Sequence, residues 1–256
     1  QVSAITSTTV TGLAVPSLEA RVMNHIPFGR QTKRTPLFGL GCLAGVAGIN
    51  RVGDYLKGHP KEAAILVSVE LCSLTLQKQD LSIANIIASG LFGDGCAAVL
   101  MVGDEHPLAQ QSSLRWISPR AAFFPDTERV MGWDVVDTGF RVILSPAVPK
   151  LVADELPQEV EALRAEAGMG NQPLDFVVAH PGGPKVMLAM QKALGLTEVD
   201  LAKSWKSLKT YGNMSSTSVL FVLKDTLDDL PAPGSIGMMA AMGPAFCAEL
   251  NLLERV

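Results

Sequence analysis

The sequence predicts an α/β fold, in which helices cover the faces of β-sheets. Strand and helix signals alternate along most of the chain, which favours layered sheets and helices. The 256 residues, 48% of them hydrophobic, are enough to bury a sizeable core. A cysteine, a histidine and an asparagine also stand in glycine-marked turns at predicted element ends, where α/β folds place functional residues.

The first half of the chain is expected to contain four strands and three helices, identified by β-branched runs and by helical spacing of apolar residues. Ser17 is the expected N-cap of the first helix. The predicted strands are Val2–Val10, Thr35–Leu40, Ala63–Val69 and Cys96–Val102, and the predicted helices are Ser17–Asn24, Leu43–Lys57 and Ser82–Ser89.

The second half repeats this alternation. A polar, proline-bearing stretch, Asp104–Asp126, separates the halves, so we expect domains at residues 1–103 and 104–256. The predicted helices are Pro157–Ala167, Lys185–Leu194 and Ser215–Leu227, and the predicted strands are Phe176–Ala179, Ser235–Ala241 and Phe246–Leu252.

Composition excludes several classes of function. The 21 basic and 25 acidic residues give a net charge of -4, and no basic run is longer than Lys33-Arg34, so nucleic acid is not an expected partner. No apolar stretch approaches the roughly 20 residues of a membrane span, which argues against stable membrane insertion. The four cysteines lack metal-ligand spacing and lie in apolar sequence, so we expect no metal site and a reducing cytoplasm.

The three turns together can form an acyl-transfer site. Cys42 falls at a predicted strand-to-helix turn, where the helix dipole favours the nucleophilic thiolate, and His180 can supply a nearby cation. The side-chain amide of Asn213 can stabilise the oxyanion of a thioester under attack. Each residue also has a structural interpretation, because cysteines are often buried in cores and Gly-Asn is a common turn pair.

Five segments, in this order, resemble the type III polyketide synthases, the chalcone synthase-like branch of the thiolase-fold enzymes. They are Gly-Cys42-Leu-Ala-Gly, Leu91-Phe-Gly-Asp-Gly95, His180-Pro-Gly-Gly-Pro, Tyr-Gly-Asn213-Met-Ser-Ser and Met242-Gly-Pro-Ala-Phe246. Initiating ketoacyl synthases carry a different, glutamine-containing segment after the histidine. The resemblance implies a thiolase-like, layered α-β-α-β-α fold with two pseudo-duplicated halves, of which the N-terminal half is incomplete.

The resemblance also implies roles for individual residues. Cys42, His180 and Asn213 match the catalytic set. Phe92 matches a gatekeeper between the coenzyme A tunnel and the cavity, and a second gatekeeper falls at Val142 or at Phe140. The other expected substrate-binding residues are Thr75 and Ser215 in the cavity, Gly182 and Gly183 (with Lys185) at the pantetheine entrance, and Val15, which enters the partner subunit's cavity in the family. Cys72 could also line the site.

The implied reaction joins an acyl-CoA starter to malonyl-CoA in a homodimer without a metal or redox cofactor. The segment Met131–Phe140 and the chain ending resemble bacterial enzymes that make alkylpyrones or alkylresorcinols from long fatty acyl starters, which is the interpretation we favour. The alternative is a tetrahydroxynaphthalene synthase that uses malonyl-CoA only, because such enzymes share Thr9–Leu18 and Glu70–Leu76. A third possibility is a catalytically silent thiolase-fold subunit that binds acyl groups.

Overall fold

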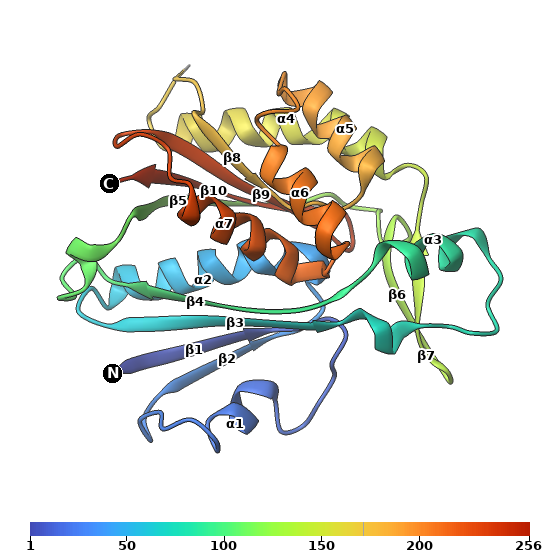
Figure 1. Cartoon of the computed structure of the whole chain (residues 1–256), viewed down its shortest axis with the longest axis horizontal. Helices are drawn as coiled ribbons and strands as arrows, with labels where there is room; N and C mark the ends of the chain where they lie inside the picture. Colours follow the sequence, from blue (N-terminus) through green and yellow to red (C-terminus); the bar gives the residue numbers. More distant parts are fainter. Residues whose placement is uncertain (171) are drawn as a thin grey trace.

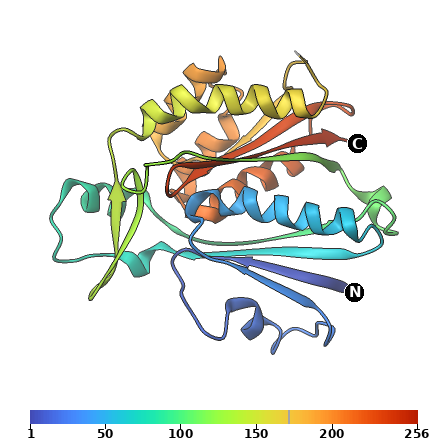
Figure 2. The same cartoon turned by 180° about the vertical axis from the view of Figure 1, so that it is seen from behind.

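The computed structural model describes residues 1–170 and 172–256. Two four-stranded sheets enclose two helices, α2 (Ala44–Gly58) and α7 (Ser218–Asp228), and a further pair, α4 (Val148–Glu166) and α5 (Pro184–Leu194), covers the far face of the second sheet (Figures 1 and 2). No helix in these ranges is long and apolar enough to cross a membrane. The α/β layering expected from the alternation of strands and helices is confirmed.

The first sheet has the order β2-β1-β3-β4. Strand β1 (Val2–Thr8) pairs in parallel with β2 (Lys33–Leu37) and with β3 (Ala63–Leu71), and β4 (Asp94–Val102) is antiparallel to β3. All four strands predicted for this half therefore form, with shifted ends. The short helix α1 (Leu18–Val22) packs on β1 and β2, and α3 (Ile83–Leu91) precedes β4.

The second sheet has the order β5-β10-β9-β8. Strand β8 (Phe176–Ala179) is parallel to β9 (Ile236–Gly243), which is antiparallel to β10 (Cys247–Arg255). The series β8-β9-β10 thus repeats the pairing of β1-β3-β4. This repetition is the pseudo-duplication of the thiolase-like fold.

Two β elements were not predicted. Strand β5 (Leu114–Phe123) lies inside the expected polar connection and pairs with β10 over its whole length. It is an edge strand, where a proline and charged side chains are tolerated and hide the strand signal. The second element is a separate hairpin of β6 (Met131–Val136) and β7 (Gly139–Leu144), joined by a two-residue turn.

The helix predictions need two corrections. Helix α4 begins nine residues before Pro157, which lies inside it, because a stripe of apolar residues continues through the proline and packs on the second sheet. Helix α6 (Ala202–Tyr211) was not predicted, since its polar face masks the helical period. The other predicted helices form with shifted ends.

Two apolar cores hold the layers together. One surrounds α2 and α7 between the sheets, and the other lies between the second sheet and α4 and α5. Helix α2 approaches its neighbours through glycines: a Cβ at Gly48 would collide with the Leu66 side chain, and one at Gly53 would lie 2.7 Å from the Trp116 ring. This close packing fixes the helix that follows Cys42.

Candidate active site

Cys42 lies in the short 3-10 helix η1 (Gly41–Leu43), which connects the first sheet to α2. Gly41 has a φ of +55°, and a side chain there would collide with the Pro244 ring. The local sequence therefore bends the chain tightly against the β9–β10 turn. The sulfur lies at the start of a helical stretch, as the sequence predicts, and donates to Ser215 Oγ at 3.6 Å.

His180 follows β8 directly. Its backbone N-H donates to the carbonyl oxygen of Ala240 on β9 at 2.8 Å, which continues the β8–β9 ladder. The side chain is buried, and neither ring nitrogen has a hydrogen-bond partner among the described residues. Both nitrogens are thus available to a bound substrate.

Asn213 is held at the other side of the pocket by its own backbone and side chain. Its N-H donates to Leu91 O at 2.8 Å, and its carbonyl accepts from Gly93 N at 3.0 Å, so Phe92 and Asn213 form an isolated parallel bridge. Its Nδ2 donates to Gly182 O at 3.0 Å and its Oδ1 accepts from Ser215 N at 2.8 Å. The orientation of the amide is therefore fixed.

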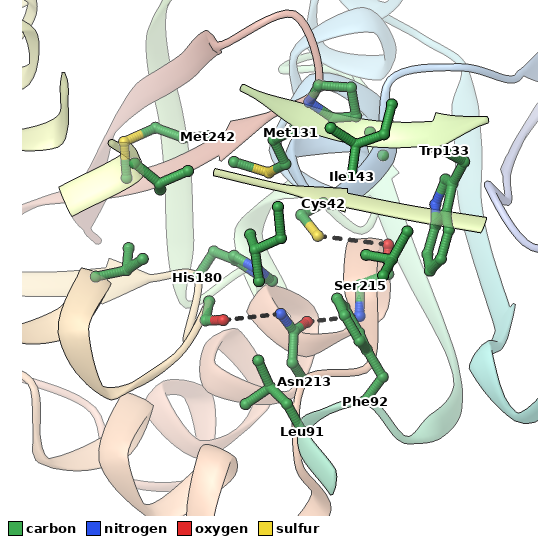
Figure 3. A pocket seen from close by; sticks show the side chains of 18 of the residues that line it. Cys42, Leu91, Phe92, Met131, Trp133, Ile143, His180, Asn213, Ser215 and Met242 are labelled. Atoms are coloured by element: carbon green, nitrogen blue, oxygen red, sulfur yellow. Dashed lines mark hydrogen bonds between the residues drawn. The ribbon is translucent and has the colours of Figure 1, made fainter. Parts of the chain in front are cut away.

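The three residues, from three distant segments, line one apolar pocket with a cavity of about 70 Å³ (Figure 3). Four of the residues expected to bind substrate line it as well: Phe92, Val142, Gly182 and Ser215. The remaining wall is mostly aliphatic and comes from the β6–β7 hairpin, α4 and α5, with single residues from η1, α3, β9 and the β9–β10 turn. It consists of Gly41, Leu91, Met131, Gly132, Trp133, Ile143, Leu144, Val148, Val152, Val186, Met242 and Pro244.

Four expected substrate-binding residues lie outside this lining. Thr75 is buried, and its Oγ1 donates to Cys72 O at 2.7 Å. Phe140 packs on Trp133, with 6.5 Å between the two ring centroids. Gly183 is the N-cap of α5, and Val15, on the β1–α1 loop, is 94% exposed. Of the two positions considered for the second gatekeeper, Val142 is the one that lines the pocket.

The sequence interpretation missed the contribution of the hairpin, above all Trp133. Its ring centroid lies 5.9 Å from that of Phe92, and the two aromatic rings lie on the same side of Cys42 (Figure 3). A signal was present: apolar residues alternate in this segment around Asp137-Thr138-Gly139, a turn sequence between two short strands.

The structure corrects the expected charge state of the site. Burial raises the pKa of Cys42 to about 11, helped by the Glu70 carboxylate, and hydrogen bonds with Ser215 and Asn213 oppose the rise only in part. Burial lowers the pKa of His180 to about 4. Desolvation thus outweighs the hydrogen bonds that favour the thiolate, and burial favours a neutral Cys42 thiol and a neutral His180 imidazole.

Glu70 is fully buried and connects three segments around Cys42. Its Oε2 accepts from Thr11 Oγ1 at 2.7 Å and from Val10 N at 3.0 Å, and its Oε1 accepts from Ser216 Oγ. Burial, with Glu70 and Cys42 nearby, also raises the pKa of the buried Cys72 thiol. The environment on this side of Cys42 therefore opposes a second negative charge.

Comparisons with known proteins agree over residues 6–256. Residues 117–256 match the model of the C-terminal domain of chalcone and stilbene synthases, and residues 6–116 match that of FAE1/type III polyketide synthase-like proteins. The chain is 44% identical to a 1,3,6,8-tetrahydroxynaphthalene synthase of Streptomyces peucetius, over 96% of this chain and 66% of that protein. It is 34% identical to a phloroglucinol synthase of Pseudomonas fluorescens, over 96% of this chain and 70% of that protein.

Solved structures give the same result. The crystal structure of 1,3,6,8-tetrahydroxynaphthalene synthase from Streptomyces coelicolor matches with a TM-score of 0.93 and 32% identity, over 99% of this chain and 72% of that one. The fold and the matched domains define a condensing enzyme of the thiolase-like class. The chain belongs to the type III polyketide synthases, a family of acyl-condensing transferases, and spans about two thirds of the length of these relatives.

Proposed function

We propose that the protein is a polyketide synthase that loads an acyl group from a coenzyme A thioester onto Cys42 and extends it with malonyl-CoA. The observation that carries this proposal is that Cys42, His180 and Asn213 line one apolar pocket. A thiol, a base and an amide donor in a site with little water are the groups that acyl transfer to sulfur requires.

In the loading step, neutral His180 acts as general base. It accepts the Cys42 proton as the sulfur attacks the thioester carbonyl, and passes this proton to the departing coenzyme A thiolate. A new C–S bond forms on Cys42 and the C–S bond to coenzyme A breaks. The low pKa of His180 suits the second half of the step, because a weakly basic imidazole releases the proton readily.

In the extension step, malonyl-CoA loses carbon dioxide and its electron pair forms an enolate. The second N-H of Asn213 and an N-H of His180 stabilise the enolate oxygen. The enolate carbon attacks the Cys42 thioester, so that a C–C bond forms and the Cys42 C–S bond breaks. The released thiolate takes up a proton from water through His180.

The pocket wall supports an aliphatic acyl starter, and hence an alkylpyrone or alkylresorcinol product. Beyond the catalytic set, the only polar side-chain groups of the lining are the hydroxyl of Ser215 and the indole N-H of Trp133. A chain built from malonyl units alone carries a carbonyl on every second carbon, and such groups are costly to bury without hydrogen-bond donors. An alkyl chain needs no such partners.

The second candidate is a synthase that uses malonyl-CoA only and makes tetrahydroxynaphthalene. Two observations favour it: the ring pair of Trp133 and Phe92 lines a cavity of only about 70 Å³, and a relative of 44% identity is named for this activity. The presence of a complete catalytic set argues against the third possibility, a catalytically silent acyl-binding subunit.

We also propose a cytoplasmic homodimer. Val15 and Leu13, on the β1–α1 loop, are 94% and 72% exposed, and apolar side chains as exposed as these favour an interface. Sedimentation of the complete protein at micromolar concentration tests this assembly. A monomer across that range would contradict it.

The decisive experiment incubates the complete protein with malonyl-CoA and a series of acyl-CoA starters of increasing length, and identifies the products by mass. For an aliphatic starter we expect kcat/KM to rise with chain length, since each buried methylene contributes about 0.8 kcal/mol, and then to level off. Val142→Phe should shorten the preferred starter. Product from malonyl-CoA alone, with no acyl-CoA of any length accepted, would select the second candidate, and Cys42→Ala is the control for both.

A further inference from the structure

A polar cluster lies in the otherwise apolar core where α2 meets the second sheet. Asn50, on α2, and Asn251, on β10, are both 0% exposed, and Glu249, also on β10, is 4% exposed. Arg51 reaches Glu249 from the surface at 2.8 Å. None of these residues lines the pocket, so the proposed chemistry does not account for them.

Every hydrogen-bonding position of the Asn50 amide is occupied by the second sheet. Its Nδ2 donates to Glu249 Oε2 at 2.7 Å and to Leu250 O at 3.0 Å. Its Oδ1 accepts from Trp116 Nε1 at 3.1 Å and from Asn251 Nδ2 at 2.8 Å. One side chain of α2 therefore makes four directional contacts with β10 and β5.

These contacts lead to the strand position that holds His180. Leu250, whose carbonyl accepts from Asn50, is paired with Ala240 across the β9–β10 ladder. The carbonyl of Ala240 in turn accepts the backbone N-H of His180. Asn50 stands eight residues after Cys42, about 12 Å along a helix. The same short path thus connects the helix of the nucleophile to the backbone of the base.

Most other contacts of α2 with the two sheets lack this directionality, and the ion pair of Arg51 with Glu249 uses a side chain that is largely exposed. Gly48 and Gly53 pack against the Leu66 side chain and the Trp116 ring, and such apolar contacts resist separation more than sliding. A shift of one residue along the helix axis would move Cys42 by about 1.5 Å. Buried polar groups are known to set the register of packed helices.

We propose that Asn50 is a positioning residue, which fixes the axial position of α2 against the second sheet and thereby the approach of the Cys42 sulfur to His180. The inference rests on the proposed function, because it takes proton transfer between these two groups as the step that needs alignment. A displacement of about 1 Å in such a pair costs on the order of 10²-fold in rate.

The test compares Asn50→Leu with Asn251→Leu in the complete protein. Both variants remove a fully buried amide, but Asn50→Leu breaks all four hydrogen bonds between α2 and the second sheet, whereas Asn251→Leu breaks only one of them. We expect Asn50→Leu to lower kcat about 100-fold with little change in KM for malonyl-CoA. We expect Asn251→Leu to lower the melting temperature comparably and to keep kcat within about threefold of the wild type. Equal kcat values in the two variants would overturn the proposal.

A second pair of variants covers the case in which Asn50→Leu does not fold. Asn50→Asp alone places two carboxylates against each other, whereas Asn50→Asp combined with Glu249→Gln restores the hydrogen bond with donor and acceptor exchanged. We expect the double variant to recover at least about tenfold in kcat over Asn50→Asp. No recovery would contradict positioning by this contact.

Alkylation of Cys42 by iodoacetamide separates this proposal from the proposed function. If His180 assists Cys42, His180→Ala should slow the alkylation of Cys42 in the wild-type background, and Asn50→Leu should slow it similarly. No effect of His180→Ala would count against the Cys42–His180 pair itself. An effect of His180→Ala without one of Asn50→Leu would count against positioning alone.

Discussion

The two sheets have the same strand pairing but different surroundings. The second sheet packs against α2 and α7 on one face and against α4 and α5 on the other, and its core residues are almost entirely buried. On the first sheet, α2 and α7 cover the inner face. On the outer face, α1 packs on β1 and β2, and the described helices leave β3 and β4 uncovered, so that Leu100 on β4 is 53% exposed (Figure 1). The shared strand pattern therefore does not imply shared stability.

This difference separates two roles. A sheet with parallel strands normally has both faces covered, so we expect further protein to pack on the open outer face of the first sheet. Exposed aliphatic side chains gather on the same half, in and before α3, among them Leu74, Leu81, Ile83 and Ile86. The well-covered second half contributes His180 and Asn213 to the pocket, and the first half contributes Cys42, which precedes a helix packed between both sheets.

The largest expected effect comes from substitution of Cys42, the residue that the first half contributes to the candidate active site. Cys42→Ala should abolish acyl loading, because the covalent bond has no other acceptor, and should leave the melting temperature nearly unchanged since only a sulfur is lost. Mass spectrometry of the intact protein after incubation with acyl-CoA measures loading. An undiminished acyl adduct in this variant would refute the assignment of Cys42.

A smaller effect is expected from substitution of Asn213, which lies in the second half. Asn213→Ala should leave acyl loading measurable but slow extension by about 10²-fold, as when one oxyanion donor is lost. The comparison of single-turnover loading with steady-state product formation separates the two steps. Equal losses in both would show that Asn213 serves the fold rather than the enolate.

Leucine-to-alanine substitutions test how unequally the two sheets are covered, because the loss of unfolding free energy is larger where the side chain is buried. Leu163→Ala, on the buried face of α4 where the side chain is 0% exposed, should cost about 2–5 kcal/mol of unfolding free energy. Leu100→Ala, on β4, should cost less than about 1 kcal/mol in this chain. Urea unfolding of both variants checks the difference, and similar costs would mean that the outer face of the first sheet is covered in solution.

The pH dependence of the unfolding free energy tests whether Cys42 and His180 are both neutral in the resting protein. The pKa of His180 is lowered from 6.5 to about 4, so between these pH values the unfolded chain binds a proton that the native state does not. The free energy of unfolding therefore falls by roughly 3 kcal/mol as the pH drops from about 6.5 to about 4. The pKa of Cys42 is raised from 9.0 to about 11, so stability also falls as the pH rises through that window. His180→Asn should remove the acid-side slope, whereas a resting thiolate–imidazolium pair would reverse it.

Much of the fold could be predicted from the sequence, because buried strands such as β3 read as continuous apolar runs bounded by turn residues. The turns around Cys42, His180 and Asn213 were recognisable for a similar reason, since glycines and element ends mark positions of close backbone approach. Gly182 and Ser215 belong to two of these segments and Phe92 to a separate one, and the resemblance to a known family pointed to all three.

What the sequence could not reveal depends on distant contacts. Trp133 reaches the pocket because the β6–β7 hairpin folds against α3, a contact that no local pattern encodes. The pKa values of Cys42 and His180 depend on how completely other segments exclude water, so local dipole arguments gave the wrong direction. In the sequence Asn50 does not differ from other polar helix residues, because its partners Glu249 and Asn251 are distant along the chain.

The backbone bridge between Phe92 and Asn213 has a consequence for redesign of the pocket. Asn213 donates its N-H to Leu91, and Gly93 donates to the Asn213 carbonyl, so the wall residue and the amide donor share one pair of hydrogen bonds. A substitution that moves the Phe92 backbone to widen the pocket also tilts Asn213, whose side-chain amide stabilises the enolate in the proposed reaction. Substrate range and turnover are therefore mechanically linked at this point, and variants that widen the pocket through side-chain truncation at Phe92 should keep more activity than those that insert or delete residues beside it.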